Sequence, residues 1–224
     1  MRHRIRKDRC SEMMFHMLVS RQCSCHHEAG HAVAWVANGY SLRLVVGHSA
    51  EGLSPEKRSV WDQALGDPSN YPAYATQGIR RARSGGGGTL TETKNVPFLE
   101  HCKGGFNESC PTCRTLLTSY LSCMFAGGAA TFILLPTEHT TSQTRDDREQ
   151  ILGMLRKAFT DEQQRTIVHD EAEGQAYALI KRESNAIRAL AKGLLDRGAL
   201  CGCEAEQVIR EHLNSSRDPR NTRA

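Results

Sequence analysis

The sequence lacks three features that would define its class directly. No run of apolar residues approaches the about 18 consecutive positions of a transmembrane helix, which predicts no membrane span in this chain. No Gly-Lys pair precedes a Ser or Thr, which excludes a P-loop nucleotide site. The basic residues at the two ends are not interleaved with aromatic residues, so no nucleic-acid partner is expected. The chain has 224 residues and a net charge of +4, enough for one substantial domain.

A recognisable export signal and a complete disulfide framework are also lacking. The apolar stretch at 13–19 is short and is interrupted by His16, so the default expectation is a cytoplasmic location. The count of 9 cysteines is odd, which argues against full disulfide pairing. Cys110 and Cys113 form the one CxxC motif of the sequence. A second, structural zinc bound by Cys102, Cys110, Cys113 and a further ligand is one interpretation, and free thiols are the other.

The most informative motif is His27-Glu28-Ala29-Gly30-His31, an HExxH pattern followed by an apolar run. Helix positions i and i+4 share one face, so the two imidazoles can bind one zinc ion through neutral nitrogens. Glu28 lies beside the first imidazole, where its carboxylate can deprotonate a water that zinc activates. Gly30 indicates close packing by a neighbouring element. We expect Zn²⁺ with His27 and His31 as ligands and Glu28 as the catalytic residue.

A catalytic zinc needs a third protein ligand. In the metzincin extension HExxHxxGxxH that ligand is a His, but here Ala34 and Ala37 occupy the Gly and the last His positions. The third ligand is therefore expected from far along the chain.

The hydrophobic pattern predicts a mainly α domain with a small β element (α+β) over residues 20–213. The motif helix is expected to end near Asn38-Gly39, followed by a strand over 41–46. A long irregular insertion is predicted at 47–88, and a short strand is predicted to follow it at 89–93.

The remaining expectations concern the C-terminal half and the two ends. Residues 1–19 are predicted to be a basic N-terminal segment and 214–224 a disordered basic tail. We expect a polar loop at 140–144 and helices at about 107–134, 146–159, 170–192 and 204–213.

Several segments, in collinear order, resemble the peptidase domain of FtsH-type zinc metalloproteases, the ATP-dependent membrane proteases of bacteria and organelles. Residues 27–32 match that family's zinc helix almost letter for letter. Three further segments are similar to its AGRxAE, TTGAxNDLxxA and LAxxLLExETL motifs: residues 126–130, 140–147 and 190–200. The resemblance covers most of residues 20–213 and implies a helical, zincin-like peptidase fold.

The resemblance implies that the Asp of the NDL segment is the third zinc ligand, and Asp146 and Asp147 both compete for that position. Placing Asp147 there puts Ile151 at the family's buried small position, whereas Asp146 would put Gln150 there. Asp147 is therefore favoured and Asp146 is the alternative. An interpretation of both as ordinary acids of a first helical turn stays open.

The implied activity is that of a zinc-dependent metalloendopeptidase acting on unfolded or flexible protein substrates. Because the sequence carries no ATPase module, a stand-alone peptidase-like domain is expected, with a separate ATPase or unfoldase as a candidate partner. The family forms hexameric rings, which leaves a homo-oligomer open. We expect the strand over 42–46 to pair with an extended polypeptide substrate.

Departures from the family pattern support an alternative function. Thr131 replaces a Glu, Arg148 replaces a Leu, and the insertion at 47–88 is longer than the usual connection. The alternative is a catalytically degenerate relative that keeps zinc and acts as a protein-binding module. A nucleic-acid module built on the basic ends and the Cys pairs ranks far below both.

Overall fold

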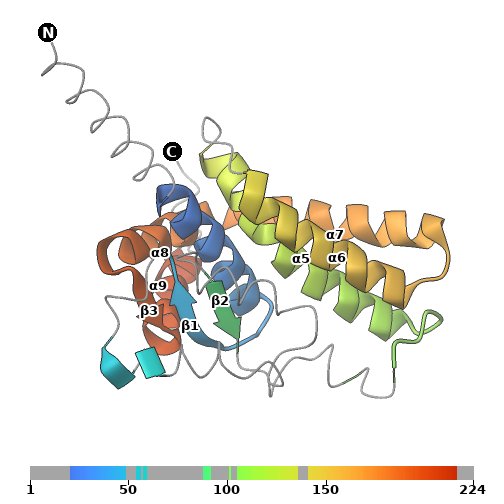
Figure 1. Ribbon diagram of the computed structural model, residues 1–224, viewed down its shortest axis with the longest axis horizontal. Helices are drawn as coiled ribbons and strands as arrows, with labels where there is room; N and C mark the ends of the chain where they lie inside the picture. Colours follow the sequence, from blue (N-terminus) through green and yellow to red (C-terminus); the bar gives the residue numbers. More distant parts are fainter. Residues whose placement is uncertain are drawn as a thin grey trace, which may run out of the picture.

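The described part of the chain is mostly helical, with one small antiparallel sheet of three strands (Figure 1). This confirms the predicted mainly α class with a small β element. The predicted N-terminal segment, most of the insertion and most of the tail lie outside the described residues. The structure, a computed structural model, describes residues 21–48, 54–56, 58–59, 88–91, 101, 105–135 and 141–215.

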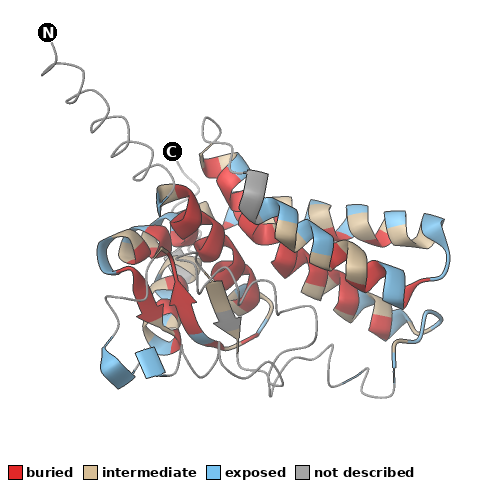
Figure 2. Cartoon of the chain, viewed as in Figure 1, coloured by how far each residue is buried: buried red, intermediate tan, exposed pale blue. Residues whose placement is uncertain are grey.

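The helix over residues 21–37 carries the HExxH motif, and we call it the HExxH helix. Its residues 23–35 are all buried, so it is enclosed by the fold on every side (Figure 2). It ends at Asn38-Gly39 as predicted, because Gly39 adopts a positive φ of 84° and donates its N–H to the Val36 carbonyl at 3.0 Å. The strand that follows therefore starts immediately beside the motif.

Strand β1 (Leu42–Val46) is the central strand of the sheet. It pairs antiparallel with β2 (Gly88–Thr91) on one side and with β3 (Ala199–Cys201) on the other. The expectation that β1 pairs with a substrate is wrong, since neighbouring strands occupy both of its edges. Among the described strands, β2 and β3 are the two outer ones, and each has one open edge that no described strand covers.

The helices after β2 differ from the sequence-based boundaries in three places. α6 (Thr141–Ala158) begins within the predicted polar loop, and no Gly or Pro interrupts its first turns. The helix predicted at 170–192 is part of two helices, α7 (Glu162–Arg182) and α8 (Ser184–Arg197), because the backbone of Glu183 leaves helical geometry. α9 (Gly202–Ser215) extends into the predicted tail.

Helix α5 (Pro111–Leu134) ends where the sequence predicted and links the parts of the core. It runs beside α6 and α7 (Figure 1) and also contacts the HExxH helix through Ala126 and Ala130. Of the described helices, α5 is the one long and apolar enough to cross a membrane, and 61% of its most apolar stretch is buried inside the fold. A buried core helix can have the same length and composition as a membrane span. Here α5 is mostly buried, and the other elements pack around it.

Candidate metal centre

Three ligand atoms from two distant segments converge in the core. His27 and His31 lie one turn apart on the HExxH helix, and their Nε2 atoms are 3.0 Å apart. The Oδ2 atom of Asp147, on α6, lies 2.9 Å from Nε2 of His27 and 3.2 Å from Nε2 of His31. The structure therefore brings together both imidazoles of the motif and a carboxylate more than a hundred residues away.

These distances fit a single zinc ion. In a tetrahedral site with bonds of about 2.0–2.1 Å, neighbouring donor atoms are about 3.3 Å apart. The three separations in this cluster are 2.9, 3.0 and 3.2 Å. Two imidazole nitrogens and one carboxylate oxygen are also a donor set that zinc accepts in catalytic sites. The described residues can therefore hold a metal ion at this position.

The carboxylate of the cluster belongs to Asp147, and Asp146 is not among the described residues that form this group. Asp147 lies in the second turn of α6, because that helix begins at Thr141. Ile151, one turn further on, is fully buried. The face of α6 that carries Asp147 is thus the face that points into the core, as the sequence-based comparison of Ile151 with Gln150 assumed.

Main-chain atoms of α5 orient one of the imidazoles. Nδ1 of His31 lies 2.8 Å from the Cys123 carbonyl oxygen, which can only accept a hydrogen bond. The proton of a neutral His31 is therefore held on Nδ1, and the lone pair of Nε2 faces the cluster. Nδ1 of His27 is buried and has no hydrogen-bond partner among the described residues.

Glycine 127 provides the space that the imidazoles occupy. A Cβ atom at Gly127 would lie 2.4 Å from Nε2 of His31 and 2.8 Å from Nε2 of His27. A Cβ atom at Gly30 would lie 2.5 Å from the Ala126 carbonyl oxygen. The HExxH helix therefore packs closely on α5 at Gly30, which confirms the close packing predicted for that residue, and the α5 backbone at Gly127 packs on the imidazoles. The sequence showed a run of small residues near Gly127 but not its contact with the ligands.

The charges within the cluster stabilise one another. Burial disfavours the charged form of His31, but the Asp147 carboxylate, together with Glu28 and the Cys123 carbonyl, raises the pKa of His31 to about 9. Burial also opposes ionisation of Asp147, yet the two imidazoles hold the pKa of that carboxyl below its usual range. Asp147 is therefore an anion at neutral pH, which is the form that binds a cation.

Glu28 is buried next to the ligands and is held by strand β2. The Thr89 hydroxyl lies 3.0 Å from Oε2 of Glu28 and 3.1 Å from its main-chain oxygen, within reach of either as a donor. Burial raises the pKa of the Glu28 carboxyl, while the imidazoles of His27 and His31 act in the opposite direction. Sequence reasoning did not identify Thr89, because the contact depends on how the sheet packs on the HExxH helix.

The cluster is accessible from the side of Asp147. The side chain of Asp147 is 23% exposed, whereas His27 and His31 are buried. Asp147 also lines a cavity of about 400 Å³ between α5, α6 and α7. Arg148, the residue that departs from the family pattern, lines the same cavity and is exposed. The carboxylate side of the cluster therefore faces the space through which a ligand can approach.

Thr131 is the other residue that departs from the family pattern. The hydrogen-bond partners of its hydroxyl among the described residues lie on its own helix, α5. Its Oγ1 lies 2.9 Å from the Gly128 carbonyl oxygen and 3.3 Å from that of Gly127. These are back-bonds within α5, and they leave the ligand cluster unchanged.

No family model matches this chain, and no curated protein matches it. The resemblance to FtsH-type peptidases therefore rests on the motifs in the sequence and stays a prediction.

Proposed function

We propose that the chain is a zinc-dependent metalloendopeptidase, with zinc bound by His27, His31 and Asp147. The observation that carries this proposal is the convergence of Nε2 of both imidazoles and Oδ2 of Asp147 within about 3 Å of one another. A buried carboxylate, that of Glu28, accompanies them. This combination matches the chemistry that the HExxH motif requires.

A zinc ion held by His27, His31 and Asp147 would supply Lewis-acid chemistry, activating water and polarising the peptide carbonyl. Glu28 accepts the proton of the attacking water on its carboxylate and gives it to the nitrogen of the leaving amine. Its raised pKa brings the proton affinity of that carboxyl closer to neutral pH. Thr89 restrains the carboxylate, and the Cys123 carbonyl keeps His31 in the tautomer that binds.

The substrate is proposed to be an extended polypeptide that adds to the open edge of β2. A peptide bound in this way gains main-chain hydrogen bonds that do not depend on its sequence. Thr89 belongs to β2 and contacts Glu28, so a peptide along this strand would run close to the catalytic carboxylate. Because only an extended segment can pair with a strand, substrates are unfolded or flexible where they are cut. A separate unfoldase is the partner that would supply folded proteins.

The test uses the full chain and two matched variants, Glu28→Gln and Glu211→Gln. Glu211 lies on α9 and is exposed, so its substitution controls for purification and for loss of one negative charge. We expect the wild type to contain zinc and to cleave casein and unstructured peptides. Glu28→Gln should keep the zinc and lose activity by roughly 10²- to 10⁴-fold, the usual contribution of a general base. Equal cleavage by both variants, or a wild type without zinc, contradicts the proposal.

The same experiment separates the peptidase from the protein-binding alternative. The alternative is favoured if the wild type retains zinc at the imidazoles but cleaves no unstructured substrate. Removal of the metal by a chelator, followed by return of zinc, should abolish and then restore cleavage only if the chain is an enzyme.

A further inference from the structure

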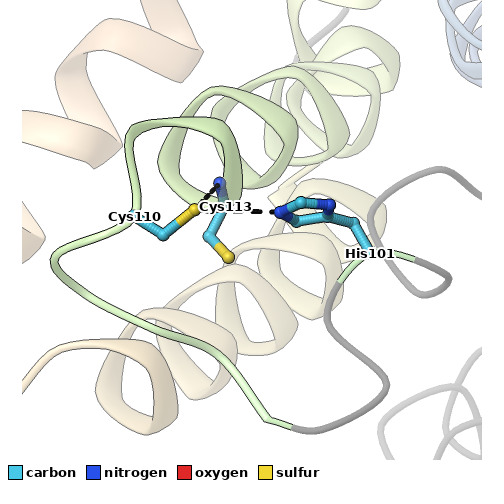
Figure 3. A group of neighbouring side chains, drawn as sticks. All are labelled: His101, Cys110 and Cys113. Carbon is cyan, nitrogen blue, oxygen red and sulfur yellow. Dashed lines mark hydrogen bonds between the residues drawn. The ribbon is translucent and has the colours of Figure 1, made fainter.

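A second group of ligand atoms lies at the start of α5, away from the HExxH motif. Cys110 is the N-cap of that helix, Cys113 lies in its first turn, and His101 precedes both (Figure 3). Each of the three side chains offers one nitrogen or sulfur atom, and these atoms all lie within 4.8 Å of one another. The sequence pointed to the CxxC motif and left one further ligand unassigned, with His101 just upstream of the motif. Cys102, the further thiol considered from the sequence, lies outside the described residues.

The spacing of one pair in this group suits a tetrahedral ion. Sγ of Cys110 lies 3.7 Å from Nε2 of His101. A zinc ion with a sulfur bond of about 2.3 Å and a nitrogen bond of about 2.05 Å would hold these atoms about 3.6 Å apart. The backbone N–H of Cys113 donates to Sγ of Cys110 at 3.4 Å, which fixes the CxxC turn around the sulfur. Cys110 and His101 are therefore already at ligand spacing.

The chemistry of the thiols also favours a cation. The contact with His101 and the backbone N–H of Cys113 lower the pKa of Cys110 to about 6, so these neighbours favour the thiolate. The thiolate is the form that binds metals. By contrast, burial raises the pKa of the Cys25 thiol to about 12. Cys110 thus differs from a cysteine that serves as core packing.

We propose that His101, Cys110 and Cys113 form a second zinc site, in which one imidazole nitrogen and two thiolates bind the ion. Soft sulfur ligands with an imidazole select zinc over magnesium or calcium. The bound ion would tie the chain at residue 101 to the first turn of α5. Cys113 and Gly127 are separated by about 21 Å along α5, at 1.5 Å per residue, so this site is independent of the His27–His31–Asp147 cluster.

Cobalt substitution distinguishes the two sites, because only this one contains sulfur. The metal-free full chain is titrated with Co²⁺ while near-ultraviolet absorption from thiolate-to-metal charge transfer is recorded. We expect the wild type to bind two ions and to show the thiolate band for one of them. The double variant His27→Ala/His31→Ala should bind one ion and keep the band. Failure of the peptidase proposal would leave the thiolate band of the second site unchanged.

Substitutions at the second site identify its ligands. Cys110→Ser should abolish the thiolate band, and His101→Ala should weaken Co²⁺ binding at this site by at least about tenfold. His101 is exposed, so its replacement leaves the core intact. The His101→Ala variant therefore tests the site even if a Cys113→Ser variant misfolds. Cys203→Ser is the matched control, because it removes an exposed thiol from another close cysteine pair. A wild type without the band, or a Cys110→Ser variant that keeps it, overturns the proposal.

Discussion

The His27–His31–Asp147 cluster and the His101–Cys110–Cys113 cluster lie along the same helix, α5, but they are assembled differently. The first joins a buried helix to a carboxylate 116 residues beyond His31 in sequence. The second gathers side chains from a short stretch of chain, with His101 exposed and Cys110 half-buried. The first therefore depends on how three helices pack, and the second depends mainly on the local conformation before α5.

This difference determines which changes should affect each cluster. Where packing positions the ligands, substitutions that move helices remove the metal even when every ligand is kept. Where local conformation positions them, only the ligands themselves matter strongly. The contact between Gly127 and the imidazoles gives the sharpest way to separate these two cases.

Gly127→Ala should have the largest effect on the buried cluster. The new Cβ would lie 2.4 Å from Nε2 of His31, so the imidazole and the added methyl group cannot both keep their places. We expect loss of detectable Co²⁺ at this cluster and loss of peptidase activity, with the thiolate band of the second cluster unchanged. Gly174→Ala, on α7, is the control because its Cβ would meet nothing within 4 Å. Two ions bound with wild-type affinity by Gly127→Ala would contradict packing control.

Asp147→Asn should have the next largest effect, because it removes the anionic ligand while keeping the side-chain shape. We expect Co²⁺ affinity at the buried cluster to fall on the order of 100-fold. Asp146→Asn makes the same chemical change one residue earlier and should leave the affinity nearly unchanged, since Asp146 is outside the cluster. Metal titration of both variants checks this. The reverse order of effects would assign the ligand to Asp146 instead.

Local signals explain why part of this structure could be predicted from the sequence. The HExxH spacing places two imidazoles on one helical face, and Asn38-Gly39 marks the end of that helix. Helical periodicity placed Ile151 on the buried face, where the structure has it. This favoured Asp147 over Asp146 at the ligand position that the family resemblance implied. Each of these conclusions needs only a few neighbouring residues.

The parts that sequence missed depend on contacts between distant segments. The central place of β1 follows from the pairing of β3, a strand of 3 residues that carries almost no local signal. The break at Glu183 has neither Gly nor Pro to mark it. The sequence places several small residues around Gly127, but which of them would face the imidazoles depends on the rotation of α5. The contact of Thr89 with Glu28 likewise requires the sheet to be in place.

The two clusters should differ less strongly in the rate at which they release zinc to a chelator. An ion held by the exposed His101 is open to a competing chelator, whereas His27 and His31 are buried. We expect zinc release to a chromogenic chelator in two phases, with the fast one at least about tenfold faster, because the surrounding shell controls solvent access. Cys110→Ser should remove the fast phase and Asp147→Asn the slow one. Release of zinc from the wild type in a single phase would mean that the clusters do not differ in access.

The smallest expected difference between the clusters lies in how they contribute to the pH dependence of the stability of the metal-free protein. The folded pKa of His31 is raised from 6.5 to about 9, so its contact with Asp147 stabilises the fold fully below pH 6.5. That contribution is lost as the pH rises through 9. The pKa of Asp147 is lowered, so its contribution is present above its usual value of 3.8 and is lost as the pH falls.

The free energy of unfolding of the metal-free chain, measured with urea, should therefore fall by about 1–2 kcal/mol between pH 6.5 and 9. The expected fall is this small because Asp147 is partly exposed and solvent screens its charge. Asp147→Asn should flatten this decline, because the charge that raises the pKa of His31 is gone. His101→Ala should leave the decline unchanged, since His101 is exposed and lies outside the buried cluster. A decline that follows His101 rather than Asp147 would reverse the assignment of which cluster supports the fold.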